Sequence, residues 1–206
     1  MSIDLKHGRV TSPKTRGLVA TELGLIGEWQ NNEMEGGKNF PATTSGSMPA
    51  PFESDAPSTT PPADGLILSG GKTDARECVN FTDSEMAEQL GKAFEWPCVS
   101  VTAGETLKIH WAYTAAHTTR GYRAFITKDG WDATQRISRA QLEEAPFFED
   151  IYPYVPFSQY PDKLVAKTEH DLVLPKNKRG HHVIVLLWLV ADTGNAFYQA
   201  LDVDFG

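Results

Sequence analysis

The chain has 206 residues, of which 40% are hydrophobic and 22% are charged, and its formal net charge is −8. This length is enough for one domain with a sizeable core of its own. The acidic balance argues against a nucleic-acid partner, which needs a basic surface, and against a polybasic membrane-surface protein. No run of 18 apolar residues exists, and the longest apolar stretch, residues 183–191, is too short to span a bilayer. We therefore expect a single domain with neither a nucleic-acid nor a membrane partner.

The first half of the chain predicts loops and one clear helix. Residues 42–63 hold five prolines and eight serines or threonines, which excludes a helix or an inner strand and indicates a long loop. Residues 80–94 are predicted to be helical, because Thr82 and Glu85 have the spacing of a capping box and apolar residues follow at every fourth position. The same capping spacing predicts a second short helix over residues 138–145.

The second half of the chain predicts strands. Apolar and polar residues alternate in 107–115 and in 196–205, residues 121–127 are aromatic and β-branched, and residues 183–190 form a continuous apolar run. Glycine-containing turns separate these segments. Several short strands with few helices favour a mainly β fold, a β-sandwich with the helices and long loops of residues 17–100 on one side.

Two cysteines are too few for a disulfide-rich scaffold or for a cysteine-only zinc site. If Cys78 and Cys98 pair, they close a loop of about 20 residues, which the chain-entropy model values at roughly 3 kcal/mol. The alternative is two buried free thiols.

Sequence motifs of several enzyme classes are absent, including Ser-x-x-Lys, Gly-x-Ser-x-Gly, His-Glu-x-x-His and the Walker loop. Three other stretches are distinctive: HGRVTSPKTR (7–16), WAYTAAHTTR (111–120) and ADTGNAFYQALDV (191–203). Together they resemble the lytic polysaccharide monooxygenases of the bacterial and viral chitin-binding type, auxiliary activity family ten. The resemblance runs from His7 to the C-terminus and is weakest over residues 42–100 and 144–175. It implies a fibronectin- or immunoglobulin-like sandwich that displays one copper ion on a flat face.

The resemblance also implies a metal site. In that family the mature chain begins with a histidine whose α-amino and ring nitrogens bind copper, and a second histidine supplies a third nitrogen. The motifs place these ligands at His7 and His117, and nitrogen ligands suit copper in both redox states. Phe197 matches the aromatic side chain that blocks one axial position, and Ala115 matches the small residue packed against the other. The implied reaction is copper-dependent oxidative cleavage of a crystalline β-1,4-linked polysaccharide, fed by an external electron donor and carried out by a secreted monomer.

The implied substrate is chitin first and cellulose second. Trp29, if exposed, would stack on a pyranose ring. Glu35 matches an acidic residue of the family that lies close enough to the metal to handle protons or peroxide. The remaining matches to the substrate face are Gln30, Asn31, Thr114, Asp192 and Asn195.

One departure from the family concerns the N-terminus. Six residues, MSIDLK, precede His7, so the α-nitrogen of His7 is an amide and not an amine. These residues have neither the basic nor the apolar region of an ordinary secretory signal. Residues 1–6 are an extension that is removed before the domain of 7–206 binds copper, or they replace a true signal peptide, or the protein is a non-catalytic chitin binder. A further alternative is a plain sandwich domain that binds protein partners.

Overall fold

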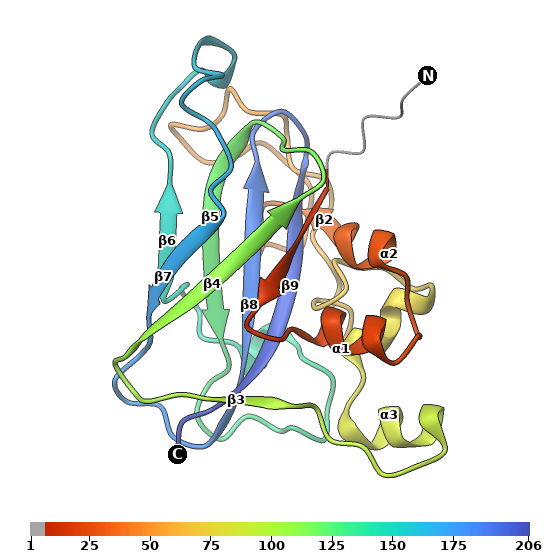
Figure 1. The fold of residues 1–206 in the computed structure, drawn as a ribbon. Coiled ribbons are helices and arrows are strands. Elements are labelled where there is room, and N and C mark those ends of the chain that lie inside the picture. Colours follow the sequence, from red (N-terminus) through yellow and green to blue (C-terminus); the bar gives the residue numbers. More distant parts are fainter. Residues whose placement is uncertain (1–6) are drawn as a thin grey trace.

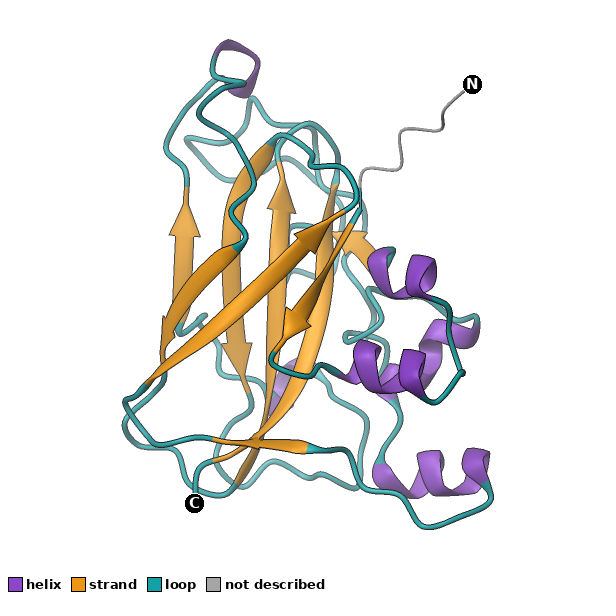
Figure 2. Ribbon diagram, in the orientation of Figure 1, coloured by secondary structure: helices purple, strands orange, loops and turns teal. Residues whose placement is uncertain are grey.

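The computed structural model describes residues 7–206, and the predicted extension of residues 1–6 lies outside them. The described chain is built mainly of strands, with short helices gathered on one side (Figures 1 and 2). The elements in chain order are β1 (Gly8–Ser12), α1 (Arg16–Glu22), α2 (Glu28–Asn32), β2 (Glu35–Gly37), η1 (Ala75–Asn80), α3 (Asp83–Leu90), β3 (Cys98–Ser100), β4 (Thr106–Tyr113), β5 (Thr119–Ile126), η2 (Arg139–Gln141), β6 (Phe148–Ile151), η3 (Phe157–Gln159), β7 (Glu169–Val173), β8 (His181–Val190) and β9 (Asn195–Asp204).

Two sheets face each other and confirm the β-sandwich. The smaller sheet has the order β1-β4-β7, and the larger has the order β2-β9-β8-β5-β6. All pairs in these two orders are antiparallel, whereas β3 lies beside β9 in parallel. A core of apolar residues fills the space between the sheets, with Trp111 from the smaller sheet and Trp188 from the larger both almost fully buried.

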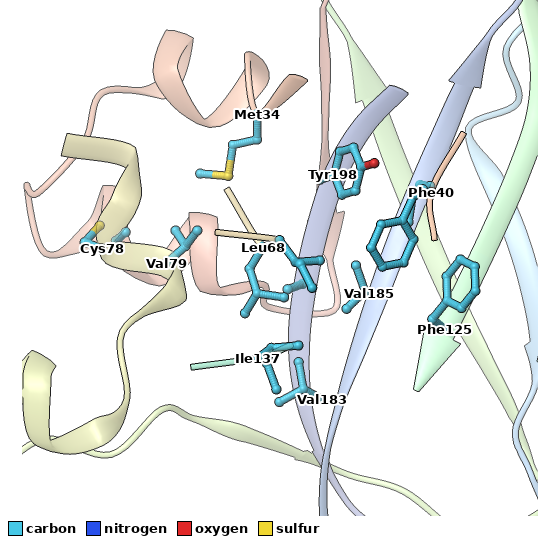
Figure 3. Close-up of a cluster of buried hydrophobic side chains, with 14 of the residues drawn as sticks. Met34, Phe40, Leu68, Cys78, Val79, Phe125, Ile137, Val183, Val185 and Tyr198 are labelled. Atoms are coloured by element: carbon cyan, nitrogen blue, oxygen red, sulfur yellow. The ribbon is translucent and has the colours of Figure 1, made fainter. Parts of the chain in front are cut away.

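The outer face of the large sheet is covered by the helices and loops of the first half of the chain. Here Val183 and Val185 of β8 pack against Leu68, Val79 and other loop and helix residues (Figure 3). Strand β8 is therefore buried on both faces, which explains why its sequence is continuously apolar and does not alternate. This second core fixes the helices and loops firmly to the sheet.

The predicted helices are shorter in the structure. The predicted helix 80–94 is α3, and its Thr82–Glu85 capping box is present, but it ends at Leu90 because Gly91 adopts a left-handed conformation with φ of 65°. The prediction of a helix over 138–145 is wrong. Ser138 N donates to Gln141 Oε1 as in a cap, but only a single 3₁₀ turn forms, because Leu142 then leaves it to pair with Thr127 in the core.

The proline-rich segment 42–63 is a loop, as predicted. Its one β-type pairing is an isolated bridge between Gly46 and Ser58. A buried ion pair ties this loop to the sandwich: Asp55 accepts from Arg120 Nε at 2.8 Å and from Arg120 Nη2 at 2.7 Å. Both side chains are fully buried. The loop is therefore held in place although it lacks regular secondary structure.

The two cysteines are free thiols. Cys78 is buried in the core between the large sheet and the helices (Figure 3). Cys98 is exposed on β3, so the structure shows neither a disulfide nor two buried thiols. Burial raises the pKa of the Cys78 thiol to about 11. Over residues 7–206, no helix is long and apolar enough to cross a membrane.

Candidate metal site and polysaccharide-binding face

His7 lies immediately before β1, at the end of the sandwich where β4 runs into β5. The β1–β4 register pairs Gly8 with Tyr113, which places His7 beside Thr114. The Thr114 backbone N–H donates to the His7 carbonyl at 2.9 Å, and Thr114 Oγ1 donates to the same oxygen at 3.1 Å. These contacts fix the backbone of His7 at one edge of the sheet.

His117 lies in the connection between β4 and β5, together with half-buried Ala115. Thr119 Oγ1 donates to the His117 carbonyl at 3.2 Å. The ring nitrogen Nδ1 of His117 lies 3.3 Å from Oδ1 of Asp192, which comes from the β8–β9 turn. These two atoms are close but do not form a hydrogen bond, so the carboxylate acts on the ring through its charge. A proton on Nδ1, facing that charge, would leave Nε2 as the nitrogen with a free electron pair.

Phe197 of β9 brings the two histidines together. Its ring centroid lies 5.8 Å from the His7 ring and 5.8 Å from the His117 ring. Phe197 is fully buried and stacks on Trp188 of the neighbouring strand at 4.6 Å. Two imidazoles that are 110 positions apart in the chain thus lie against one rigid aromatic surface. This surface, formed by the stacked rings of Phe197 and Trp188, is called the aromatic floor below.

Glu35 and Asn195 lie next to this floor. Glu35 of β2 is paired in register with Phe197, and Asn195 Nδ2 donates to Glu35 Oε1 at 2.9 Å. The side-chain oxygen of Asn195 in turn accepts a hydrogen bond from Thr59 Oγ1 of the proline-rich loop. The structure therefore gives both residues a fixed orientation beside the aromatic floor under the histidines.

Trp29 confirms the expectation of an exposed aromatic, with 55% of its surface accessible on α2. It shares a surface hollow with His7, Thr114 and Glu33. The two residues that follow it do not extend this surface. Gln30 Oε1 accepts from the Gly27 N–H at 2.9 Å and caps α2, and Asn31 is fully buried.

The prediction that Asn31 contacts substrate is wrong. Its carbonyl oxygen accepts a hydrogen bond from Gln199 Nε2 of β9 at 3.1 Å, so the residue faces the sheet. The physical reason is helical geometry: α2 presents one face to solvent, and two positions along from Trp29 the chain has turned toward the sheet. The sequence match did not indicate whether the Asn31 side chain points to solvent or to the sheet.

The side chains of this site supply two of the three nitrogen ligands that a copper site of this kind needs. The two imidazoles are good copper ligands. Within residues 7–206, however, no group of three or more histidine, cysteine, aspartate or glutamate side chains is placed to hold a metal ion. A third strong donor must come from outside these side chains, and the backbone nitrogen of His7 belongs to the same residue as one of the two imidazoles. The residues fit a three-nitrogen copper site if that nitrogen is an amine.

Two neighbours of the site have no counterpart in the sequence prediction. Glu33 Oε1 lies 3.6 Å from His7 Nδ1, and its only sequence signal is its position near Glu35. Lys38 is fully buried, and its ammonium donates to the carbonyls of Val190 at 2.6 Å and Thr193 at 2.7 Å. Burial lowers the pKa of Lys38 to about 8. Lys38 therefore links the residues before and after Asp192 and stabilises the turn that carries it.

The other histidines take structural roles. His170 and His182 are buried, and His110 makes a partly exposed contact with Glu169, on the polar side of β4 as expected. His181 Nε2 lies 2.8 Å from Oδ1 of the buried Asp202.

Comparison with known proteins identifies the family of this chain. A family model described as lytic polysaccharide mono-oxygenase, cellulose-degrading, covers residues 7–203. The chain belongs to the lytic polysaccharide monooxygenase family. It is 32% identical over 204 residues to GlcNAc-binding protein A of Shewanella oneidensis. The aligned region covers 97% of this chain and 35% of that protein. The chain thus spans about a third of the length of such curated relatives.

Two solved structures share the fold over nearly the whole chain. A chitin binding domain from Burkholderia pseudomallei superposes with a TM-score of 0.88 and 39% identity, covering 98% of this chain and 100% of that one. A lytic polysaccharide monooxygenase of auxiliary activity family ten from Streptomyces lividans gives a TM-score of 0.73 and 30% identity, covering 97% and 100%.

Proposed function

We propose that this domain is a secreted copper-dependent monooxygenase that oxidatively cleaves crystalline β-1,4-linked polysaccharide, with chitin as the preferred substrate. The observation that carries the proposal is the convergence of His7 and His117 on the buried ring of Phe197. Family membership supports the reaction class. The names of two relatives, a GlcNAc-binding protein and a chitin binding domain, support chitin over cellulose.

In this proposal His7 and His117 hold copper through their rings, and the backbone nitrogen of His7 is the third ligand. That nitrogen is an amide while Lys6 is attached, and an amide must lose a proton to bind a metal. We therefore propose that residues 1–6 are removed and that 7–206 is the active domain. Bound copper would supply one-electron chemistry, with electrons from an external donor, to activate oxygen or peroxide.

The residues around the histidines have separate tasks in the proposed reaction. The Asp192 carboxylate orients the His117 ring through Nδ1. Phe197 would shield the bound ion with its apolar ring, and Ala115, in the same connection as His117, would keep a small side chain beside it. Glu35, whose Oε1 accepts a hydrogen bond from Asn195 Nδ2, would hold or pass protons during the reaction.

The polymer is bound by an open surface and not by an enclosed pocket. Trp29 offers a ring to one pyranose unit, and the exposed Thr114, whose hydroxyl donates to the His7 carbonyl, would lie beside the polymer. An open face suits a chain that is still held in a crystal lattice, because such a chain cannot enter a closed cavity. The same face would also serve a chitin-binding domain without catalysis, which the name of the Burkholderia pseudomallei relative favours as a second candidate.

The proposal is tested with two forms of the protein, one that begins at His7 and one that keeps residues 1–6. We expect calorimetry to show tight copper binding only for the form that begins at His7. With chitin and a reductant, mass spectrometry should find oligosaccharides that have gained one oxygen atom. His117→Ala in the same form should lose both copper binding and oxidised products while still sedimenting with chitin.

Other outcomes separate the candidates. Chitin binding without oxidised products in the copper-loaded form that begins at His7 would leave only the binding domain. An absence of both copper and polysaccharide binding would overturn both candidates.

A further inference from the structure

Exposed aromatic side chains are few in this molecule and lie in two places. Among the large hydrophobic side chains of residues 7–206 that are well exposed, three are aromatic: Trp29 at 55%, Tyr154 at 38% and Tyr160 at 37%. The two tyrosines form a pair, with ring centroids 5.6 Å apart and planes tilted by 40°. Nothing in the histidine site described above uses this pair.

The tyrosine pair is linked to the end of the sandwich that carries His117. The Tyr160 carbonyl accepts the N–H of Leu164 at 3.2 Å, and the Leu164 carbonyl accepts the N–H of Thr119 at 2.7 Å. Thr119 is two residues after His117 and contacts its carbonyl. The loop with the η3 turn rises at the same end of the molecule as the β4–β5 connection, whereas α2 with Trp29 lies on the other side (Figures 1 and 2).

The backbone of the loop that carries the two tyrosines is fixed by hydrogen bonds from the buried Arg120. Arg120 Nη1 donates to the carbonyls of Tyr152 at 2.5 Å and Tyr154 at 3.1 Å, while the rest of its guanidinium binds the buried Asp55. Partly buried Phe157 packs against the core between the sheets. The two rings are therefore presented by a fixed backbone, so little conformational entropy is lost when a ligand covers them.

The surroundings of the pair fit a sugar. A pyranose ring has an apolar face of C–H groups and a rim of hydroxyls, so it needs an aromatic surface bordered by polar side chains. Exposed polar residues border the two rings in sequence: Ser158, Gln159, Asp162 and Lys163. A protein partner would instead favour a larger continuous apolar patch.

We propose that Tyr154 and Tyr160 form a second sugar-binding subsite for the same polymer, on the His117 side of the proposed copper site and opposite Trp29. The ligand is a stretch of β-1,4-linked N-acetylglucosamine units that continues beyond the units at the histidines. Two separated aromatic contacts orient a chain across the site, which one contact cannot do. This inference rests on the proposed function, since the ligand is the proposed substrate.

The test is a binding isotherm on insoluble β-chitin, measured without copper. We expect Tyr154→Ala with Tyr160→Ala to lower the partition coefficient about 2- to 13-fold, the range that an aromatic contact of about 0.5–1.5 kcal/mol gives. Tyr154→Phe with Tyr160→Phe should keep wild-type binding, because the rings remain. The matched control is Val173→Ala, which removes a side chain that is 59% exposed at the opposite end of β4, where Val173 pairs with Thr106.

A second measurement does not depend on the variants. Addition of a soluble N-acetylglucosamine hexamer to the wild-type protein should shift the NMR signals of the Tyr154 and Tyr160 rings. The subsite is overturned if wild-type protein binds chitin and the double alanine variant, with an unchanged melting temperature, binds it equally well. Loss of binding in the double phenylalanine variant would overturn ring stacking. Failure of the wild-type protein to bind either chitin or cellulose would instead overturn the polysaccharide function on which the subsite rests.

Discussion

Nδ1 of His117 lies 3.3 Å from Oδ1 of Asp192, and these two residues come from different connections of the sandwich. His117 is between β4 and β5, and Asp192 is in the turn between β8 and β9. Because Lys38 binds carbonyls on both sides of that turn, the carboxylate is held where it can orient the imidazole.

Replacing Asp192 by alanine should therefore weaken copper binding by about 10- to 100-fold, the usual effect of losing a group that orients a metal ligand. Copper titration of the form that begins at His7 measures this. Asp162→Ala, which removes an exposed carboxylate on the η3 side of the molecule, is the control and should leave the affinity unchanged. Equal affinities for wild type and Asp192→Ala would contradict an orienting role.

Removing one partner of the buried Arg120–Asp55 pair should destabilise the protein strongly. Arg120→Met leaves the Asp55 carboxylate buried without its partner, and breaking such a pair costs about 3–5 kcal/mol. Denaturant unfolding monitored by tryptophan fluorescence gives the change in the free energy of unfolding. Lys14→Met, which breaks an exposed ion pair with Glu22, should have no measurable effect. Combining Arg120→Met with Asp55→Leu should recover part of the loss, because the Asp55 carboxylate is then no longer buried without its partner.

Stability should fall above neutral pH because of His181. The hydrogen bond that His181 donates to the Asp202 carboxylate raises the pKa of His181 to about 10 in the folded protein, from about 6.5 in an unfolded chain. The stabilising contribution of its charged form is thus complete below about pH 6.5 and is lost as the pH rises through about 10. We expect the melting temperature to drop by about 1–3 °C between pH 7 and pH 8.

The pH range of this measurement separates His181 from the other histidines with shifted pKa values, whereas Lys38 begins to titrate within it. Burial lowers the pKa values of His170 and His182, so their effect on stability falls below about pH 6.5. Lys38, with a pKa lowered to about 8, acts with the opposite sign and adds stability above that pH. His181→Gln should remove the drop between pH 7 and pH 8. An identical drop in this variant would show that another group causes it.

Trp29→Ala should weaken chitin binding without changing stability. The ring is more than half exposed, so its removal leaves no cavity, but a sugar-stacking surface beside His7 is lost. We expect the partition coefficient on chitin to fall about threefold to tenfold. Leu23→Ala, at an exposed position in the segment between α1 and α2, is the control and should bind as wild type does. Unchanged binding by Trp29→Ala would place the polymer elsewhere on the surface.

The strands and the site residues differ in how well local sequence reveals them. Residues 107–113 alternate because one face of β4 packs on the core, and residues 183–190 are continuously apolar because β8 is covered on both sides. Short edge elements such as β1 and β2 leave no such pattern, because their pairing comes from distant segments. The helix predicted over 138–145 failed for the same reason: its capping signal is local, but the burial of Leu142 is not.

The sequence by itself determined the sandwich, the family resemblance and the candidate ligands His7 and His117, because periodicity and motifs are properties of neighbouring residues. Tertiary structure decided which candidates share a surface. It placed Phe197 beneath both histidines, turned Asn31 into the interior while leaving Trp29 outside, and separated the two cysteines. It also revealed Glu33, Lys38, Arg120 and the tyrosine pair. These contacts join segments far apart in the chain, and only the packing of the two sheets and their loops brings such segments together.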